Sequence, residues 1–378
     1  MYIHQTSEWP NFVWDKPRID AAFAKVNKAA GFLEGRLSTL GFDAQRKAAV
    51  EALTHDIMAS SEIENVALNL DQVRSSVARR MGVHITNETE PSHYVEGVVE
   101  MMMDAVRNFD TPLTDERLFG WHNCLFPTGR SGMETIHVGQ YRIDPMNVQS
   151  GALGREKIHY HAPEAEFVPG EMKKFLDWFN AADTPKDYVK SAVAHFWFVS
   201  IHPFDDGNGR ISRAIAEMAL SQADQSTTRY YSISRQINQE KRKYYRALEK
   251  CQKGSCDITS WMEWYLDCML RSINGAGEML STILNKAIFW QTHAQIVFSD
   301  RQKQMLNVWL DGYSGKLTAK NWAGRSKTSP DTAVRDIKDL VEKGVLVAKE
   351  GAQRNVAYGV VISKDLVVFA ENSVSSLE

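Results

Sequence analysis

The spacing of apolar side chains predicts helices over most of this chain. In residues 17–37, PRIDAAFAKVNKAAGFLEGRL, apolar side chains recur every three or four positions, which places them on one face of a helix. Residues 44–65 form a second predicted helix. Residues 186–201, KDYVKSAVAHFWFVSI, are apolar on nearly every side, so we expect a central helix that is buried all round.

One segment interrupts this helical pattern. Residues 144–169, DPMNVQSGALGREKIHYHAPEAEFVP, carry two glycines in the middle, followed by KIHYH and then APEAEFVP. Such a sequence predicts a β-hairpin or an extended flap rather than a helix.

The last 80 or so residues have a different pattern. SDRQKQMLNVWLDG predicts the start of a helix. A second helix has clear end signals, with Ser329 as the N-cap, Pro330 at the first helical position and Gly344 just past the end. The segment VLVAKEGAQRNVAYGVVI then predicts strand, turn and strand. Helix, helix and β-ribbon in this order predict a winged helix.

The chain divides where these patterns change. A polar stretch, HITNETEPSH at 84–93, contains Pro91 and marks a domain boundary. A length of 378 residues allows two or three domains. We expect an N-terminal helical domain at 1–90, a mainly helical domain with the hairpin flap at 91–290, and a winged-helix domain at 291–378. The predicted fold class is mainly α.

Composition narrows the class of protein further. Apolar residues make up 43% and charged residues 24% of the chain, as in ordinary soluble globular proteins. With a net charge of −3, any nucleic-acid surface has to be local. The first residues show no signal peptide, and no apolar run approaches the roughly 20 residues of a spanning helix. The cysteines form no CxxC pair, so we expect a cytoplasmic protein with reduced thiols and without structural zinc.

Residues 200–213, SIHPFDDGNGRISR, combine residue types that a core does not need. Pro203 cannot continue the preceding helix, so His202 lies just past the helix end at the head of a loop. The glycines let the backbone turn tightly and approach a ligand, and the free N–H groups at the start of the next helix bind anions. Arg210 and Arg213 lie three residues apart on one face of that helix.

These groups together suit the chemistry of a nucleoside triphosphate. A carboxylate just before the two arginines can hold Mg²⁺, which prefers one or two carboxylates plus substrate phosphates. His202 can take the proton of a hydroxyl that attacks phosphorus, because its ordinary pKa lies near working pH. The transfer then needs mainly positioning and charge neutralisation. Each element alone is more often a turn or a solvated face, but their joint occurrence in this order favours an active site.

The stretch HPFDDGNGR resembles the Fic-family motif HxFx(D/E)GNGR at every defined position, and Arg213 matches the second arginine of its longer form. Proteins of the Fic (filamentation induced by cAMP) family are mostly helical and typically transfer AMP from ATP to a protein hydroxyl. The resemblance implies His202 as the base and Asp206, not Asp205, as the magnesium ligand. Phe204 is the apolar anchor of the loop. The resemblance also implies a set of phosphate-binding residues: Gly207, Asn208 and Gly209 at the α-phosphate, and Arg210 and Arg213 at the β- and γ-phosphates.

Further segments resemble other parts of the family. Residues 139–148, GQYRIDPMNV, resemble the segment before its flap, and residues 148–162 resemble the flap, which aligns a target segment by adding it as a strand. Residues 230–249 resemble the region beside the adenine, so Tyr231 and Tyr245 are candidates for that pocket. The alternative is that the tyrosines of this segment simply pack their helix.

A second short motif, SSEIEN at 60–65, matches the inhibitory motif of the family, (S/T)xxxE(G/N), with Ser60, Glu64 and Asn65. Ser60 and Glu64 share a helix face, and Asn65 tolerates the left-handed conformation that ends helices. At a helix C-terminus the charge of Glu64 is unfavourable unless a cation is near. The resemblance supplies Arg213 as that cation, which would keep the γ-phosphate from seating productively. We predict autoinhibition in cis, although the same glutamate could instead position a water for AMP removal.

The predicted winged helix has a charge opposite in sign to that of the whole chain. Residues 316–356 carry nine positive and five negative side chains. Such a domain could meet DNA through the major groove. However, Asp331, Asp336 and Asp339 lie on or near its second helix, where phosphates would repel them. We therefore favour a protein-contact role and keep DNA as the alternative.

The sequence thus predicts a magnesium-dependent, autoinhibited protein adenylyltransferase that uses ATP and acts on a Ser, Thr or Tyr hydroxyl. The alternatives are AMP removal at the same site, transfer of another phosphate-containing group, and a DNA-binding regulator whose Fic domain only senses nucleotide. The expected partner is a target protein that carries this hydroxyl. A homodimer would be unsurprising for the family, and no membrane partner is expected.

Overall fold

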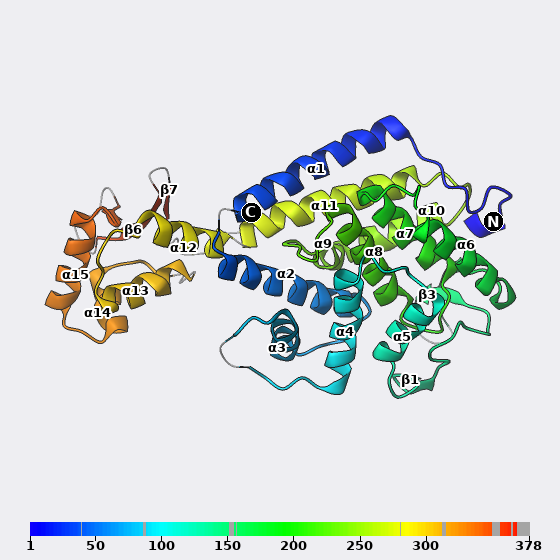
Figure 1. The fold of residues 1–378 in the computed structure, drawn as a ribbon, viewed down its shortest axis with the longest axis horizontal. Helices are drawn as coiled ribbons and strands as arrows, with labels where there is room; N and C mark the ends of the chain where they lie inside the picture. The colour runs from blue at the N-terminus through cyan, green and yellow to red at the C-terminus, as the bar shows by residue number, and fades with distance from the viewer. Residues whose placement is uncertain are drawn as a thin grey trace. The chain divides into compact units, whose positions relative to one another are not determined.

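The fold is mainly helical, as predicted, with short strands in small antiparallel sheets (Figure 1). The computed structural model describes residues 1–38, 40–85, 88–150, 155, 157–279, 281–311, 315–349, 356–363 and 366–368. Its contacts divide the chain into two compact units, Met1–Glu34 with Arg46–Ala276 and Gly35–Gln45 with Gly277–Glu378. Within the described ranges, no helix combines the length and the apolar content that crossing a membrane requires.

Figure 1 labels the elements in chain order. The helices up to residue 279 are α1 (Lys16–Ser38), α2 (Phe42–Ile63), α3 (Leu70–Met81), α4 (His93–Arg107), α5 (Asp115–Leu125), α6 (Val168–Asn180), α7 (Tyr188–Ile201), α8 (Asn208–Asp224), α9 (Ile233–Gln239), α10 (Lys241–Cys251) and α11 (Thr259–Met279). The later helices are α12 (Ser281–Thr292), α13 (Asp300–Leu310), α14 (Ala319–Ser326) and α15 (Pro330–Glu342). The strands are β1 (Arg130–Ser131), β2 (Glu134–Thr135), β3 (Asn147–Ser150), β4 (Lys157–His161), β5 (Leu346–Ala348), β6 (Tyr358–Ser363) and β7 (Leu366–Val368).

Helices α7 and α8 pack against each other in the larger unit. Every residue of α7 from Lys190 to Ile201 is buried, which confirms the predicted central helix. The ammonium group of Lys190 donates to the carbonyl of Phe179 and to the side chain of Gln222, both at 2.7 Å. These bonds offset the cost of burying its charge. The active-site motif begins where this buried helix ends.

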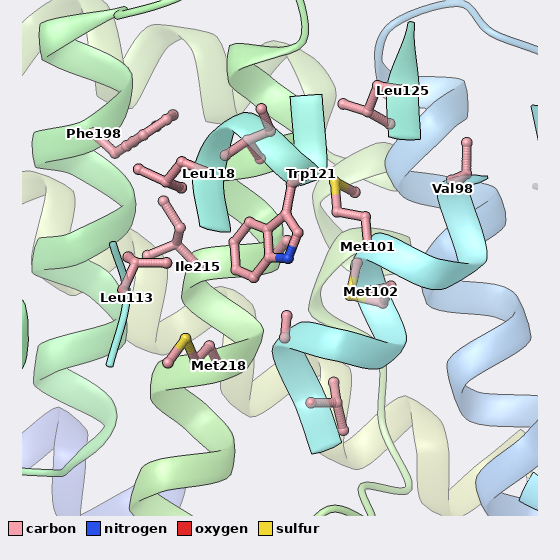
Figure 2. Packing of buried hydrophobic residues seen from close by; sticks show 14 of the residues in the cluster. Val98, Met101, Met102, Leu113, Leu118, Trp121, Leu125, Phe198, Ile215 and Met218 are labelled. Atoms are coloured by element: carbon pink, nitrogen blue, oxygen red, sulfur yellow. The ribbon is translucent and has the colours of Figure 1, made fainter. Parts of the chain in front are cut away.

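The main hydrophobic core fills the space between α4, α5, α7 and α8. Figure 2 shows the indole of Trp121, from α5, lying among Met101 and Met102 of α4 and Met218 of α8. The indole N–H of Trp121 donates to the carboxylate of Asp104 at 2.7 Å, so this large side chain is buried without losing its hydrogen bond. The core therefore fixes α8, which carries both motif arginines.

The elements predicted around the motif are present with small shifts. The helix predicted over 44–65 is α2, which ends at Ile63, just before Glu64. The predicted hairpin is formed by β3 and β4, which pair antiparallel with a bulge between Val148 and Gln149. Residues 151–154 and 156 of the flap lie outside the described residues. The short hairpin of β1 and β2 was not predicted.

The smaller unit contains both predicted helices, as α13 and α15, followed by the predicted strands, but helix α14, which was not predicted, lies between the two helices. Helix α15 begins with Ser329 as N-cap, whose hydroxyl accepts from the Thr332 N–H, and with Pro330 at its first turn. Gly344 follows the helix end with a φ of +70°, the left-handed conformation that the sequence predicted there. Strands β5, β6 and β7 form one antiparallel sheet, in which β7 is an addition to the predicted ribbon. The winged-helix assignment itself stays a prediction.

Candidate active site

The motif loop between α7 and α8 is closed by its own residues. His202 caps α7 in the left-handed conformation, with φ +52° and ψ +60°, and its N–H donates to the Phe198 carbonyl. The side-chain amide of Asn208 accepts from the Phe204 N–H at 3.0 Å and donates to the Phe204 carbonyl at 2.7 Å. The Phe204 ring is fully buried and stacks on the imidazole of His122 at 4.3 Å. Phe204 therefore anchors the loop in the core.

The imidazole of His202 is oriented for the role of a base. Its Nδ1 lies 3.1 Å from the carbonyl of Val199. A carbonyl only accepts, so Nδ1 carries the hydrogen and Nε2 is left as the acceptor. Burial lowers the pKa of this imidazole below its ordinary value, because removal from water disfavours the charged form. The neutral, proton-accepting form is thereby favoured.

Arg142 holds the backbone of this loop, and the sequence analysis gave it no role. Its side chain is buried, and its Nε donates to the carbonyl of His202 at 2.7 Å. Its other nitrogens donate to the carbonyls of Asp144 and Pro163, while its own N–H donates to the Pro203 carbonyl at 2.9 Å. Arg142 thus ties the segment before the flap to the loop. Its sequence signal is the segment GQYRIDPMNV, which was noted as a whole without singling out this side chain.

His122 is a second supporting residue that sequence reasoning did not identify. Its Nε2 donates to the backbone carbonyl of Asp206 at 3.1 Å, and its Nδ1 accepts from the Gly139 N–H at 3.3 Å. Burial lowers its pKa to about 4, so the ring stays neutral. A histidine on the buried face of an amphipathic helix carries no sequence signal that separates this role from simple packing.

The two carboxylates of the motif differ in their surroundings. One carboxylate oxygen of Asp205 accepts from both the N–H and the Nδ1 of His137, each at 2.8 Å. The side chain of Asp206 is 43% exposed and accepts from the Ser131 hydroxyl and the Gly207 N–H. Asp206 is therefore the more exposed of the two carboxylates, with each oxygen accepting one hydrogen bond, whereas the Asp205 side chain is only 16% exposed. A half-exposed carboxylate beside Arg210 fits a Mg²⁺ ion that also binds substrate phosphates.

The start of α8 forms a cradle for an anion. Gly207 has a φ of +84°, which a residue with a side chain rarely adopts, and a Cβ there would lie 2.9 Å from the Phe126 ring. The first N–H groups of α8, from Asn208 on, have no acceptor within the helix. A Cβ on Gly209 would lie only 2.0 Å from a carboxylate oxygen of Glu64. The carboxylate of Glu64 therefore covers the cradle at Gly209.

Arg210 is buried and already oriented. Its guanidinium lies 4.9 Å above the ring of Phe126, and its Nη1 donates to the hydroxyl of Tyr94 at 2.9 Å. Its nearest carboxylate oxygen, on Asp206, is 3.9 Å away. Its Nε has no hydrogen-bond partner among the described residues. A buried donor of this kind is ready to bind an anionic ligand.

Arg213 is bound by Ser60 and Glu64 of the segment SSEIEN. Its Nε donates to the Ser60 hydroxyl at 2.8 Å, and its Nη2 donates to the Ser60 carbonyl at 2.7 Å and to the Glu64 carboxylate at 2.9 Å. Asn65 follows with a φ of +59°, the left-handed conformation predicted for it. We call these bonds of Ser60 and Glu64 to Arg213 the Glu64 contact. The structure thus brings the two motifs together, although 149 residues separate Glu64 from Arg213.

The two candidate tyrosines of the adenine pocket lie in different surroundings. Tyr245 is 41% exposed, and burial of the rest of its ring and the nearby Glu64 raise its pKa to about 12. Tyr231 is buried, with the guanidinium of Arg229 5.6 Å from its ring and Glu217 among its charged neighbours. Tyr245 is thus close to the Glu64 contact, whereas Tyr231 lies beside the C-terminal half of α8. Their assignment to adenine stays a prediction.

Comparisons with known proteins agree with the motif. Residues 112–220 match the model of the Fic/DOC family, and residues 2–83 match a family described as a domain of unknown function (DUF4172). The chain is 26% identical over 261 residues to the protein adenylyltransferase Fic of Drosophila willistoni, covering 63% of this chain and 48% of that protein. It is 27% identical over 241 residues to the protein of the same name from Culex quinquefasciatus, covering 61% and 42%. The chain thus spans about half the length of the curated relatives it matches.

A solved structure shares the fold. The chain superposes on a Fic family protein from Desulfovibrio desulfuricans G20 with a TM-score of 0.54 and 21% identity, covering 91% of this chain and 96% of the other. The loop with His202, together with Arg210 and Arg213 of α8, lies inside the matched residues 112–220. This chain therefore carries a Fic/DOC domain, which confirms the family resemblance of the motif.

Proposed function

We propose that this chain is a protein adenylyltransferase that moves AMP from ATP to a Ser, Thr or Tyr hydroxyl of a protein. The observation that carries the proposal is the arrangement of α8 and the loop before it. His202 presents Nε2 as an acceptor, the Asp206 carboxylate is partly exposed, and Nε of the buried Arg210 has no hydrogen-bond partner among the described residues. The names of the curated relatives support the same activity.

In the proposed transfer, one P–O bond forms as another breaks. The hydroxyl oxygen of the target attacks the α-phosphorus of ATP, and its proton passes to Nε2 of His202. The new P–O bond forms as the bond between the α-phosphorus and the bridging oxygen to the β-phosphate breaks, and pyrophosphate leaves with that electron pair. Arg210 and Arg213 neutralise the leaving phosphates, and the N–H groups of the glycine cradle hold the α-phosphate. Asp206 would hold Mg²⁺, which neutralises phosphate charge when bound.

Autoinhibition is part of the proposal. The carboxylate of Glu64 occupies the space above Gly209 and bonds to Arg213. A γ-phosphate that needs Arg213 cannot take this position while Glu64 holds it. Nη1 of Arg213 has no partner among the described residues, so the guanidinium is not saturated by the Glu64 contact. The resting chain is therefore expected to transfer AMP slowly.

The test is the intact mass of the chain after incubation with Mg-ATP. We compare the wild type, Glu64→Gly, and Glu64→Gly combined with His202→Ala, each checked for a native melting curve. An AMP adduct on the chain or on a lysate protein with Glu64→Gly alone supports both transfer and inhibition. If Glu64→Gly is folded but labels nothing, the transferase proposal is wrong. Loss of AMP from a pre-modified protein only with Glu64 present would instead favour AMP removal.

The structure also bears on whether the smaller unit binds protein or DNA. Asp336 is buried and accepts two bonds from Arg301, at 2.6 and 2.8 Å. Asp339 accepts from Gln302 and Lys343. These carboxylates are neutralised within the unit, so the repulsion of phosphates expected from them is reduced.

DNA therefore remains a candidate partner beside protein. The full chain is tested by fluorescence anisotropy on random duplexes at low salt, with Lys327→Ala and Arg335→Ala as variants. Binding that both variants weaken, and that falls with salt, supports DNA. Unchanged anisotropy favours the protein-contact role. We place the protein in the cytoplasm as part of this proposal, because the cysteines of the described residues are free thiols.

A further inference from the structure

Asp56 is a buried carboxylate on the helix that carries the inhibitory motif, and the proposed mechanism does not use it. It lies one helical turn before Ser60 on the same face of α2, and Glu64 directly follows the end of this helix. One oxygen of Asp56 accepts from the Ser232 hydroxyl at 2.6 Å and from the Ser234 N–H at 3.1 Å. The other accepts from the Ser234 hydroxyl at 3.0 Å. Asp56 thus joins α2 to the start of α9.

Burying a carboxylate at this position costs free energy. Burial raises the pKa of Asp56, because removal from water disfavours the charged form, and the bonds from Ser232 and Ser234 only partly oppose this. An apolar side chain of similar size would often stabilise a buried site equally well. The carboxylate adds a geometric constraint between the two helices, because its hydrogen bonds form only at defined distances and angles. Asp56 is therefore suited to fixing a position.

The rest of the α2 interface is rich in small side chains. Of its buried residues, only Val50, Ile57 and Ile63 are larger aliphatic side chains, and the others are Ala, Ser, Thr and Asp56 itself. Helices are held in register when large side chains of one enter the grooves of the other. The polar bonds of Asp56 therefore add a directional constraint to the packing of Val50, Ile57 and the partly buried Leu53 and Met58.

The partners of Asp56 are themselves fixed. Ser232 is the N-cap of α9, and its carbonyl accepts from the Ser272 hydroxyl of α11 at 2.7 Å. Two further bonds join the end of α2 to α9 and α10, from Asn238 to Glu62 and from Lys241 to Asn65, but both are exposed. Exposed polar pairs contribute little. The buried bonds of Asp56 are therefore the stronger tie.

We propose that Asp56 is a positioning residue for autoinhibition: through Ser232 and Ser234 it holds α2 in the register that places Glu64 over Gly209 and against Arg213. This inference rests on the proposed function. It assigns the strength of inhibition to a site two turns away from the Glu64 contact. Loss of the tie lets α2 shift, and Arg213 then becomes available to phosphate.

The experiment measures AMP incorporation by the full chain in two backgrounds. Asp56→Ala is made in the wild type and in Glu64→Gly, together with Asp56→Asn, which keeps one oxygen acceptor for Ser232. Asp43→Ala, an exposed acid at the other end of α2, is the matched control. Because three buried hydrogen bonds are lost, Asp56→Ala should raise the wild-type rate about ten-fold. Asp56→Asn should restore most of the inhibition, and Asp43→Ala should change nothing.

The second background separates positioning from plain stability. In Glu64→Gly no inhibition remains, so Asp56→Ala should leave the rate within about two-fold. A lower rate in both backgrounds would mean that Asp56 only supports the fold, and an unchanged rate in the wild type would overturn the proposal. If Glu64→Gly itself is inactive, the proposed function fails instead. If Asp56→Ala does not fold, Ser234→Ala takes its place, because it removes only one of the three hydrogen bonds to Asp56. This variant is expected to raise the rate roughly two-fold in the wild type and to leave it unchanged in Glu64→Gly.

Hydrogen exchange provides a readout independent of catalysis. In Asp56→Ala the amides at the end of α2, residues 57–65, should exchange faster than in the wild type. The amides of α7 should keep their protection, because no bond of Asp56 reaches that helix. Equal exchange of residues 57–65 in both proteins would contradict the proposed tie.

Discussion

The motif loop and the Glu64 contact lie side by side but are built in different ways. The loop has its own closure by neighbours in sequence, such as Asn208 bonding to Phe204 four residues before it, and Arg142 holds it in addition. The Glu64 contact joins residues 149 or more positions apart and depends on where α2 stands. Local closure survives small movements of distant helices, whereas a contact between distant elements does not. Disturbing the loop should therefore remove activity, and disturbing α2 should release it.

The largest effect is expected from the base. In the Glu64→Gly background, His202→Ala should lower the rate of AMP incorporation about 10² to 10⁴-fold, the usual contribution of a positioned general base. The measurement is the initial rate with labelled ATP. The melting temperature controls for folding. A loss smaller than about ten-fold would show that another group accepts the proton.

The next effect tests the support of the loop. Arg142→Met removes a buried guanidinium that holds three backbone carbonyls, among them that of His202. We expect the free energy of unfolding to fall by about 3 kcal/mol, because the lost bonds involve a charged donor. Urea unfolding measures this, with the exposed Arg130→Met as control. If Arg142→Met changes stability no more than Arg130→Met, the loop does not depend on this side chain.

A graded effect is expected at the Glu64 contact. Glu64→Gln keeps the shape of the side chain but removes its charge from a buried arginine. Its rate of AMP incorporation should lie between those of the wild type and Glu64→Gly, about ten-fold above the wild type. Rates measured side by side at one ATP concentration decide this. A rate of Glu64→Gln equal to that of the wild type would mean that space above Gly209, rather than charge, causes inhibition.

The smallest effect concerns pH. The pKa of His202 is lowered by burial, so the proton-accepting form persists below pH 6.5, where an ordinary histidine is largely protonated. In the Glu64→Gly background, the acid limb of the rate profile should have its midpoint below 6.5. The profile of kcat/KM between pH 5 and 8 measures it. A midpoint above 6.5 would require a carboxylate close to the imidazole in the free enzyme.

Much of this site follows from short-range sequence signals. Pro203 after an apolar helix and Gly207 before the next one define the loop, and Asn65 after Glu64 defines the end of α2. Such signals act within a few residues, where backbone geometry leaves little choice. For the same reason Ser329 and Gly344 mark the ends of α15.

The supporting residues could not be found in this way. Arg142, His122 and Tyr94 act on the motif from 60 or more residues away, through a backbone carbonyl or another side chain. A buried Asp in a helical pattern, such as Asp56, looks like an ordinary polar position until its partners are known. Their roles depend on tertiary packing, which the hydrophobic pattern does not specify at the level of single contacts.

The small space above Gly209 has a quantitative consequence for nucleotide binding. A Cβ there would meet Glu64 at 2.0 Å, so the space above this residue holds one oxygen-bearing group at a time. Under the proposed function the two candidates are the chain's own carboxylate and a phosphate of the nucleotide. Their occupancies are linked reciprocally: the factor by which Glu64 weakens seating of the phosphate is the factor by which the phosphate weakens the Glu64 contact. The fraction of chains with the Glu64 contact formed then falls as the nucleotide concentration rises. The register of α2 determines the concentration at which this change occurs.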